Sequence, residues 1–316
     1  MAVFVDLVVG YLSASLRILT PIGLAAVGEL IVERSGILNL SVEGIMLMGA
    51  FVGFITTFYT GNPFLGLLAA GAVGLILALV FGLLTVSAGL DQVLMGIALN
   101  LFVLGTTFFL YRAVFGWYVS PIPPHVKTLI EPIAIPVLSS IPVIGPILFN
   151  QLALTYVLIA LIPVTAYVLN STKIGLHLRA CGENPQVADY MGINVYLYRY
   201  AALAFEGVLA GIAGSLYTIS LYDMFLDNIT AGRGFVAVAM VILGQWSPWK
   251  TLFATFFYSM VEALQLRIQA LGLISAWFPY QFALMLPYLT TIVALAVFGR
   301  RVKGPEWLAK TFRRLR

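Results

Sequence analysis

The chain has very little charge. Only 9% of its 316 residues are Asp, Glu, Lys or Arg, whereas soluble domains usually carry about 25%. So few charges cannot cover a globular surface in water, which excludes an ordinary soluble protein. The hydrophobic share is 61% and the mean hydropathy is +1.01. These values indicate an integral membrane protein.

The chain is also poor in the residues that carry catalytic or metal chemistry. Cys181 is its one cysteine, so an intrachain disulfide is excluded. His125 and His177 are its two histidines, neither falls within a predicted span, and no cluster has metal-ligand spacing. The phosphate-loop pattern G-x-x-x-x-G-K-[ST] is absent. We therefore expect no metal site, no catalytic residues and no nucleotide site in this chain, and an intramembrane enzyme is disfavoured.

Long charge-free runs fill the sequence instead. Residues 44–90, 92–111, 132–172 and 268–299 contain no charged residue, and "GNP" at 61–63 divides the first run. A membrane-spanning helix needs roughly 20 apolar residues, and the alternation typical of outer-membrane barrels is missing. We predict an all-α polytopic membrane protein with about 8–10 transmembrane helices. The nine candidate spans are residues 7–28, 44–59, 64–89, 92–115, 152–169, 200–221, 234–246, 251–271 and 280–299.

Basic residues predict the orientation. The tail at 300–316 holds seven of the 17 Lys and Arg residues, and the loop at 171–199 carries three more. Such loops stay in the cytoplasm, and four predicted spans separate the two, which agrees with a common side. Residues 116–150 then lie outside, and residues 33–43 inside. Contact with anionic lipid is the simplest further role of the basic tail, and no nucleic-acid partner is expected.

The loop at 171–199 contains a short helix signature, "ENPQVADYMG". Asn184 is a good N-cap, Pro185 suits the first helical position, and Gly192 can end the helix. The predicted helix, 185–191, is about 10 Å long and cannot span a membrane. It is either part of an ordinary ordered loop or a docking element for a cytoplasmic partner.

Four segments together resemble a known family. They are "GELIVERSGILNLSVEGIMLMGAF", "DQVLMGIALNLFVLGTTFFLYR", "LRACGENPQVADYMGINV" and "GRGFVAVAMVILGQWSP", which run in order from about Gly28 to Trp249. They resemble the permease subunits of type II ABC importers, the branch with the ribose, branched-chain amino acid and nucleoside permeases. The wording "SGILNLSVEG" is most similar to the nucleoside and simple-sugar permeases.

The resemblance implies a set of partners. Residues 1–316 would form a single permease domain that pairs with a second, paralogous permease chain in the cell membrane. A separate cytoplasmic ABC ATPase would bind ATP and Mg, and an extracytoplasmic binding protein or lipoprotein would deliver the solute to the outer loops at 116–150 and 222–232. The chain itself would be no enzyme and hold no cofactor. Residues matching the family's ATPase-coupling segment are Gly182, Glu183, Asn184, Pro185, Ala188, Met191 and Gly192.

Polar residues at bilayer depth are rare and usually face a bundle interior or a wet cavity. The candidates for the translocation path are Asn39, Ser41, Glu43, Asn100, Glu206 and Asn228. Each could instead bond a neighbouring helix. "NLSVEG" at 39–44 and "NITAGRG" at 228–234 are weakly alike and fall on opposite membrane sides in the predicted topology, as an inverted repeat requires.

The sequence thus favours an ATP-driven importer permease for nucleosides. A ribose or other simple-sugar permease and a branched-chain amino acid permease remain alternatives within the family. A secondary transporter that uses an ion gradient is the alternative of a different class. It would explain the buried carboxyl groups and the repeat, but it would not explain the capped helix at 185–191.

Overall fold

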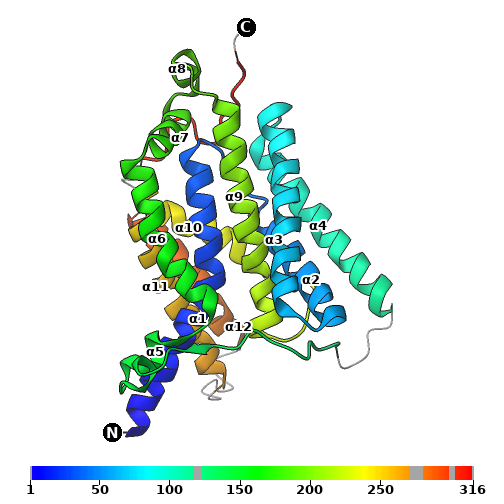
Figure 1. Cartoon of the computed structure of the whole chain (residues 1–316), viewed down its shortest axis with the longest axis vertical. Coiled ribbons are helices and arrows are strands. Elements are labelled where there is room, and N and C mark those ends of the chain that lie inside the picture. Colours follow the sequence, from blue (N-terminus) through cyan, green and yellow to red (C-terminus); the bar gives the residue numbers. More distant parts are fainter. Residues whose placement is uncertain (1, 117–122, 271–279, 299–302, 315–316) are drawn as a thin grey trace.

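The computed structural model describes residues 2–116, 123–270, 280–298 and 303–314 and is almost entirely helical (Figure 1). Its α-helices are α1 (Ala2–Arg34), α2 (Val42–Thr60), α3 (Pro63–Gly82), α4 (Gln92–Phe115), α5 (Ile144–Leu148), α6 (Ala153–Ser171), α7 (Lys173–Glu183), α8 (Pro185–Tyr190), α9 (Val195–Leu216), α10 (Arg233–Leu243), α11 (Pro248–Ala270) and α12 (Tyr280–Phe298). Short π-helical turns extend α3 (Leu83–Ser87) and α9 (Tyr217–Leu221), a 3-10 turn spans Leu138–Ser140, and β1 (Ile133–Ala134) pairs with β2 (Asn150–Gln151). The prediction of an all-α membrane protein is confirmed.

The two ends of the helix bundle differ. Helices α7 and α8 and the C-terminal segment lie at one end, and α5 lies toward the opposite end, where the chain begins (Figure 1). The turn that closes α2 belongs to the α5 end, because Thr128 donates a hydrogen bond to the Gly61 carbonyl at 2.7 Å. The predicted outer loop and the predicted cytoplasmic loop therefore lie at opposite ends of the molecule.

Among the residues that the structure describes, six helices are long and apolar enough to cross a membrane, judged by length and composition: Asp6–Arg34, Val42–Thr60, Pro63–Ser87, Gln92–Phe115, Ala153–Ser171 and Val195–Leu221. The "GNP" break is as predicted: Gly61 ends α2 with a φ of 68°, and the Asn62 side chain caps α3.

The span expected at 234–246 is different. It appears as α10, 11 residues long, which is about 16 Å and roughly half the hydrocarbon thickness. Positive φ angles interrupt the chain before it at Asn228, Ala231 and Gly232, and after it at Gln245 and Trp246. The expectation of a complete span here was wrong, because turns on both sides limit the helix to about three turns.

Glycines bring α2, α3 and α9 into backbone contact. A Cβ atom at Gly74 on α3 would overlap the Gly207 carbonyl oxygen on α9, and one at Gly49 on α2 would overlap the Gly211 carbonyl. These three helices form a tightly packed block on which the other elements rest.

We expect Gly74→Ala to destabilise this block. The added methyl group meets backbone atoms, which cannot move aside, and overpacking of this kind typically costs about 1–3 kcal/mol. Thermal unfolding of the purified protein in detergent should show a lowered Tm. Gly105→Ala on α4 is the matched control, because a Cβ there meets nothing within 4 Å. Equal Tm values for the two variants would contradict the packing account.

Candidate functional site

Two breaks in the helical chain meet inside the protein. The first lies between α1 and α2, where Gly36 has a φ of 88° and the chain turns back along the end of α1. The second precedes α10. From their meeting point α2 runs to the α5 end of the bundle, and α10 runs to the end that holds α7 and α8. The two segments whose sequences are alike are therefore in contact and lead away in opposite directions, as the inverted repeat predicts.

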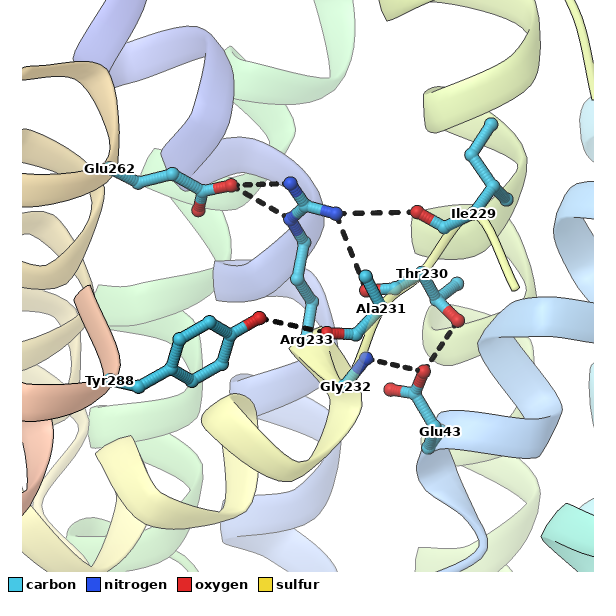
Figure 2. Close-up of polar contacts among 8 residues, drawn as sticks. All are labelled: Glu43, Ile229, Thr230, Ala231, Gly232, Arg233, Glu262 and Tyr288. Carbon is cyan, nitrogen blue, oxygen red and sulfur yellow. Dashed lines mark hydrogen bonds and ion pairs between the residues drawn. The ribbon is translucent and has the colours of Figure 1, made fainter. Parts of the chain in front are cut away.

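Glu43 makes this contact. One of its carboxyl oxygens accepts hydrogen bonds from the Thr230 hydroxyl at 2.5 Å and the Gly232 N–H at 2.8 Å (Figure 2). The other oxygen accepts from the Gly234 N–H at 2.6 Å. A Cβ at Gly234 would overlap the Glu43 backbone. The carboxyl group of one break thus satisfies the free N–H groups at the N-terminus of α10, where the helix dipole favours an acidic partner.

Arg233 turns away from Glu43 and binds Glu262 on α11 (Figure 2). The Glu262 Oε1 atom accepts from the guanidinium Nε at 2.9 Å and from Nη2 at 2.5 Å. The guanidinium carbon also lies 5.0 Å from the Tyr217 ring centroid, and the Tyr288 hydroxyl donates to the Ala231 carbonyl at 2.9 Å. The Arg233 and Glu262 side chains are 14% and 5% exposed. This ion pair balances the buried charge and holds the break against α11.

A cavity of about 350 Å³ opens beside the meeting point. It lies between α2, α4 and the start of α10, and its lining residues are Glu43, Gly44, Leu47, Ile97, Asn100, Leu101, Leu104, Asn228, Ala231, Gly232 and Phe235. Three of the predicted path residues, Glu43, Asn100 and Asn228, therefore come together around one cavity.

Asn100 has a second task. Its side-chain oxygen accepts from the Gly44 N–H at 2.7 Å, and its amide donates to the Leu40 carbonyl at 2.8 Å. These bonds satisfy backbone groups at the start of α2. An Asn side chain still has one N–H and one lone pair after two such bonds, so Asn100 can support the break and also face a solute.

The other three predicted path residues lie in a separate buried cluster. The Asn39 amide donates to the Glu206 carboxyl at 2.8 Å, and its side-chain oxygen accepts from the Ser41 hydroxyl at 2.5 Å. The backbone N–H of Asn39 donates to Glu29 at 3.2 Å. All four side chains are fully buried, and none of them lines the 350 Å³ cavity. Their contacts fix the first break against α1 and α9.

The predicted coupling segment forms α7, α8 and the turn after them. Asn184 caps α8 by accepting from the Val187 N–H at 3.1 Å, and Gly192 has a φ of 83°. Of the seven predicted residues, Gly182, Pro185 and Ala188 are buried, whereas Glu183, Asn184, Met191 and Gly192 are exposed. Tyr190 and Met191 are 74% and 79% exposed.

Sequence reasoning missed several residues of these sites. Val187 adds to the exposed apolar surface of α8 at 54% exposure. Thr230, Gly232 and Phe235 complete the cap and the cavity. The likeness of "NLSVEG" and "NITAGRG" carried the signal for Thr230 and Gly232. The position of Phe235 depends on where α10 begins, which the sequence did not reveal.

Comparisons with known proteins agree on the family of the chain. The family model for the permease component of branched-chain amino acid transport systems matches residues 11–297. The guanosine ABC transporter permease protein NupQ of Bacillus subtilis is 35% identical over 302 residues, which is 93% of each chain. The nucleoside permease protein NupC of Lactococcus lactis is 33% identical over 91% of each chain. The Haloferax volcanii protein TsgC13, provisionally assigned as a glucose ABC transporter permease, is 35% identical, also over 91% of each chain.

More distant relatives come from the same organisms. A second guanosine permease protein of Bacillus subtilis, NupP, is 23% identical over 246 residues, 74% of this chain and 67% of its own. A second nucleoside permease protein of Lactococcus lactis, NupB, matches over 113 residues at 28% identity, 35% of this chain and 31% of its own. No solved structure matches the chain. Because the family model covers most of the sequence and its relatives align over nine-tenths of it, the chain belongs to the family of branched-chain amino acid transport system permease components.

Proposed function

We propose that this ABC permease is one of two different permease chains of an importer for nucleosides. The observation that carries the substrate class is the 33–35% identity with the NupC and NupQ permease proteins over more than nine-tenths of this chain. Nucleosides combine a polar sugar with a flat base. The cavity beside Glu43 offers both amide groups and the aromatic ring of Phe235, which suits such a solute.

A second chain would complete the path. The cavity is lined by one face of α4, and this part of α4 is largely exposed: Leu101, which lines the cavity, is 64% exposed, and the adjacent Phe102 is 62% exposed. A path open to lipid on this side could not carry a polar solute, so we infer that a second permease covers it. Bacillus subtilis and Lactococcus lactis each have two such permease proteins, and this chain is more similar to NupQ and NupC than to NupP and NupB. This favours a paralogous partner over a second copy.

The exposed side of α8 would dock a separate ATPase that binds ATP and Mg. Val187, Tyr190 and Met191 form an apolar patch on this short helix, and such patches mark interaction sites. In this arrangement α8 and the C-terminus lie in the cytoplasm. An extracytoplasmic binding protein would then dock at the opposite end, around residues 123–150 and 222–227, because residues 228–232 lie at the junction with Glu43.

A simple-sugar importer is the second candidate, because TsgC13 is as similar to this chain as NupQ. An ion-gradient transporter is the alternative of another class, and it would need no ATPase.

Uptake by the reconstituted complex should separate these candidates. We expect vesicles with both permeases, the ATPase and the binding protein to take up labelled guanosine only when ATP is hydrolysed, and excess unlabelled nucleosides to compete. Competition by glucose alone, or by leucine alone, would contradict the nucleoside assignment. Uptake that continues without ATP hydrolysis would contradict the importer class.

The docking patch predicts a coupling defect. The double change Tyr190→Ala with Met191→Ala removes apolar surface that is exposed in this chain, so the permease should fold normally and bind the ATPase about tenfold more weakly. Co-purification and uptake measure this effect. Phe64→Ala is the control, since Phe64 is 65% exposed at the start of α3, beside the Gly61 turn at the opposite end of the molecule. Equal ATPase binding by both variants would show that α8 is not the docking site.

The cavity predicts a transport defect at Asn100. Replacing it by Leu removes both hydrogen bonds to the start of α2 and the amide that faces the cavity. We expect initial uptake rates to fall about tenfold or more, because unpaired buried polar groups are costly. Leu68→Ala changes an exposed side chain on α3 that does not line this cavity and should leave uptake nearly unchanged. Similar losses in both variants would remove Asn100 from the path.

A further inference from the structure

The C-terminal segment at 303–314 lies against the proposed docking helix. It starts near the end of α10 and finishes on α8, and on the way it crosses the end of α7. There the Trp307 N–H donates to the Gly182 carbonyl at 2.9 Å. A basic segment that served only topology or lipid contact would not need to pack on protein. Its aromatic residues therefore call for another role.

Phe312 anchors this segment. Its side chain is only 4% exposed and packs with Cys181 of α7, Ala188 of α8 and Val195 of α9. Its ring centroid lies 5.7 Å from that of Tyr196 and also 5.7 Å from the guanidinium carbon of Arg199. One aromatic ring from the tail thus fills the space where α7, α8 and α9 meet.

An ion pair adds to the anchor. The Arg314 guanidinium donates to the Asp189 carboxyl group at 2.9 Å, and these side chains are 66% and 14% exposed. Ala188 and Asp189 therefore both face the tail. Val187, Tyr190 and Met191 are exposed instead, so the tail and a docking partner would occupy different faces of α8.

The beginning of the segment contacts the other functional element. Gly304 lies so close to the Trp246 ring that a Cβ would fall 2.7 Å from it. Trp246 follows α10, its carbonyl accepts from the Arg34 guanidinium at 2.7 and 3.0 Å, and its indole N–H donates to Glu33. The same 12 residues therefore contact both α8 and the end of the short helix that begins at the cavity.

We propose that residues 303–314 form a strap that holds α8 in its docking position and ties it to the cavity helix α10, with Phe312 as the positioning residue. The proposal rests on the proposed function in one respect, that α8 docks the ATPase. Movement of α8 on the ATPase would then be passed to α10 through the strap, because the strap contacts both elements.

The native Cys181 thiol reports on the strap. It is the one cysteine of the chain, it is fully buried beside Phe312, and burial raises the pKa of this thiol to about 11. It should therefore react slowly with a maleimide in the intact permease. In permease complexes in lipid nanodiscs, we expect Phe312→Ala to speed the labelling of Cys181 about tenfold, because local opening exposes the thiol. Phe312→Leu, which keeps an apolar anchor, should restore slow labelling.

A second buried phenylalanine provides the control. Phe225 is 1% exposed and packs on Phe51 and Tyr111, away from the tail. Phe225→Ala should leave Cys181 labelling slow. Unchanged labelling in Phe312→Ala, or equal acceleration in Phe225→Ala, would overturn the strap.

The ion pair gives a test that does not depend on the core. Arg314→Asp and Asp189→Arg should each speed labelling up to about fivefold, the range of an exposed pair, and the double swap should reverse the effect. Additive acceleration in the double variant would overturn the pairing.

ATPase capture is then measured on the same samples. Faster labelling with weaker capture supports the strap and the docking role together. Faster labelling with unchanged capture overturns the docking role of α8 and leaves the strap standing.

Discussion

The hydrogen bonds of Glu43 are the interaction on which the rest of the structure depends. Its carboxyl group receives three donors from the segment before α10 and from the first residues of that helix. In a protein that has few charges and is surrounded by lipid, free N–H groups at the start of a helix need a hydrogen-bond acceptor within the protein. Glu43 provides it, and it does so from the start of another helix. The two breaks therefore stabilise each other through this carboxyl group.

The remaining architecture holds this junction in place. The glycine contacts of α2, α3 and α9 give a close-packed block, with Glu206 of α9 reaching Asn39 and thereby the first break. On the other side, the Arg233–Glu262 pair fixes the second break to α11. The cavity lies where these supports leave space, between α2, α4 and α10. Because α2 and α10 run from the cavity toward opposite ends of the molecule, a movement at either end can be transmitted to the cavity through one helix.

The sequence predicted the elements better than their assembly. Charge-free runs, the break at "GNP" and the Asn184 cap follow from local rules, and these elements form as expected. The contact between "NLSVEG" and "NITAGRG" is different, because it depends on a positive φ angle at Ala231, and alanine rarely takes this conformation. For the same reason, α10 was expected as a full span.

The sequence did not show which of the six predicted path residues line the cavity. Only the three-dimensional structure places Asn39, Ser41 and Glu206 in a buried cluster, and Glu43, Asn100 and Asn228 around the cavity. The sequence also did not predict that Phe312 packs among α7, α8 and α9, because the basic residues of the tail suggested only topology and lipid contact.

A double-mutant cycle between Glu43→Gln and Thr230→Val tests the central claim most directly. Thermal unfolding and nucleoside uptake would be measured for the parent, both single variants and the double variant. If Glu43 joins the two breaks through Thr230, the losses in unfolding free energy should be non-additive, with a coupling energy of about 1 kcal/mol or more. Nucleoside uptake should be lowest in the variants that lose most stability. Additive losses in stability, together with normal uptake in Glu43→Gln, would show that the two breaks do not depend on this carboxyl group.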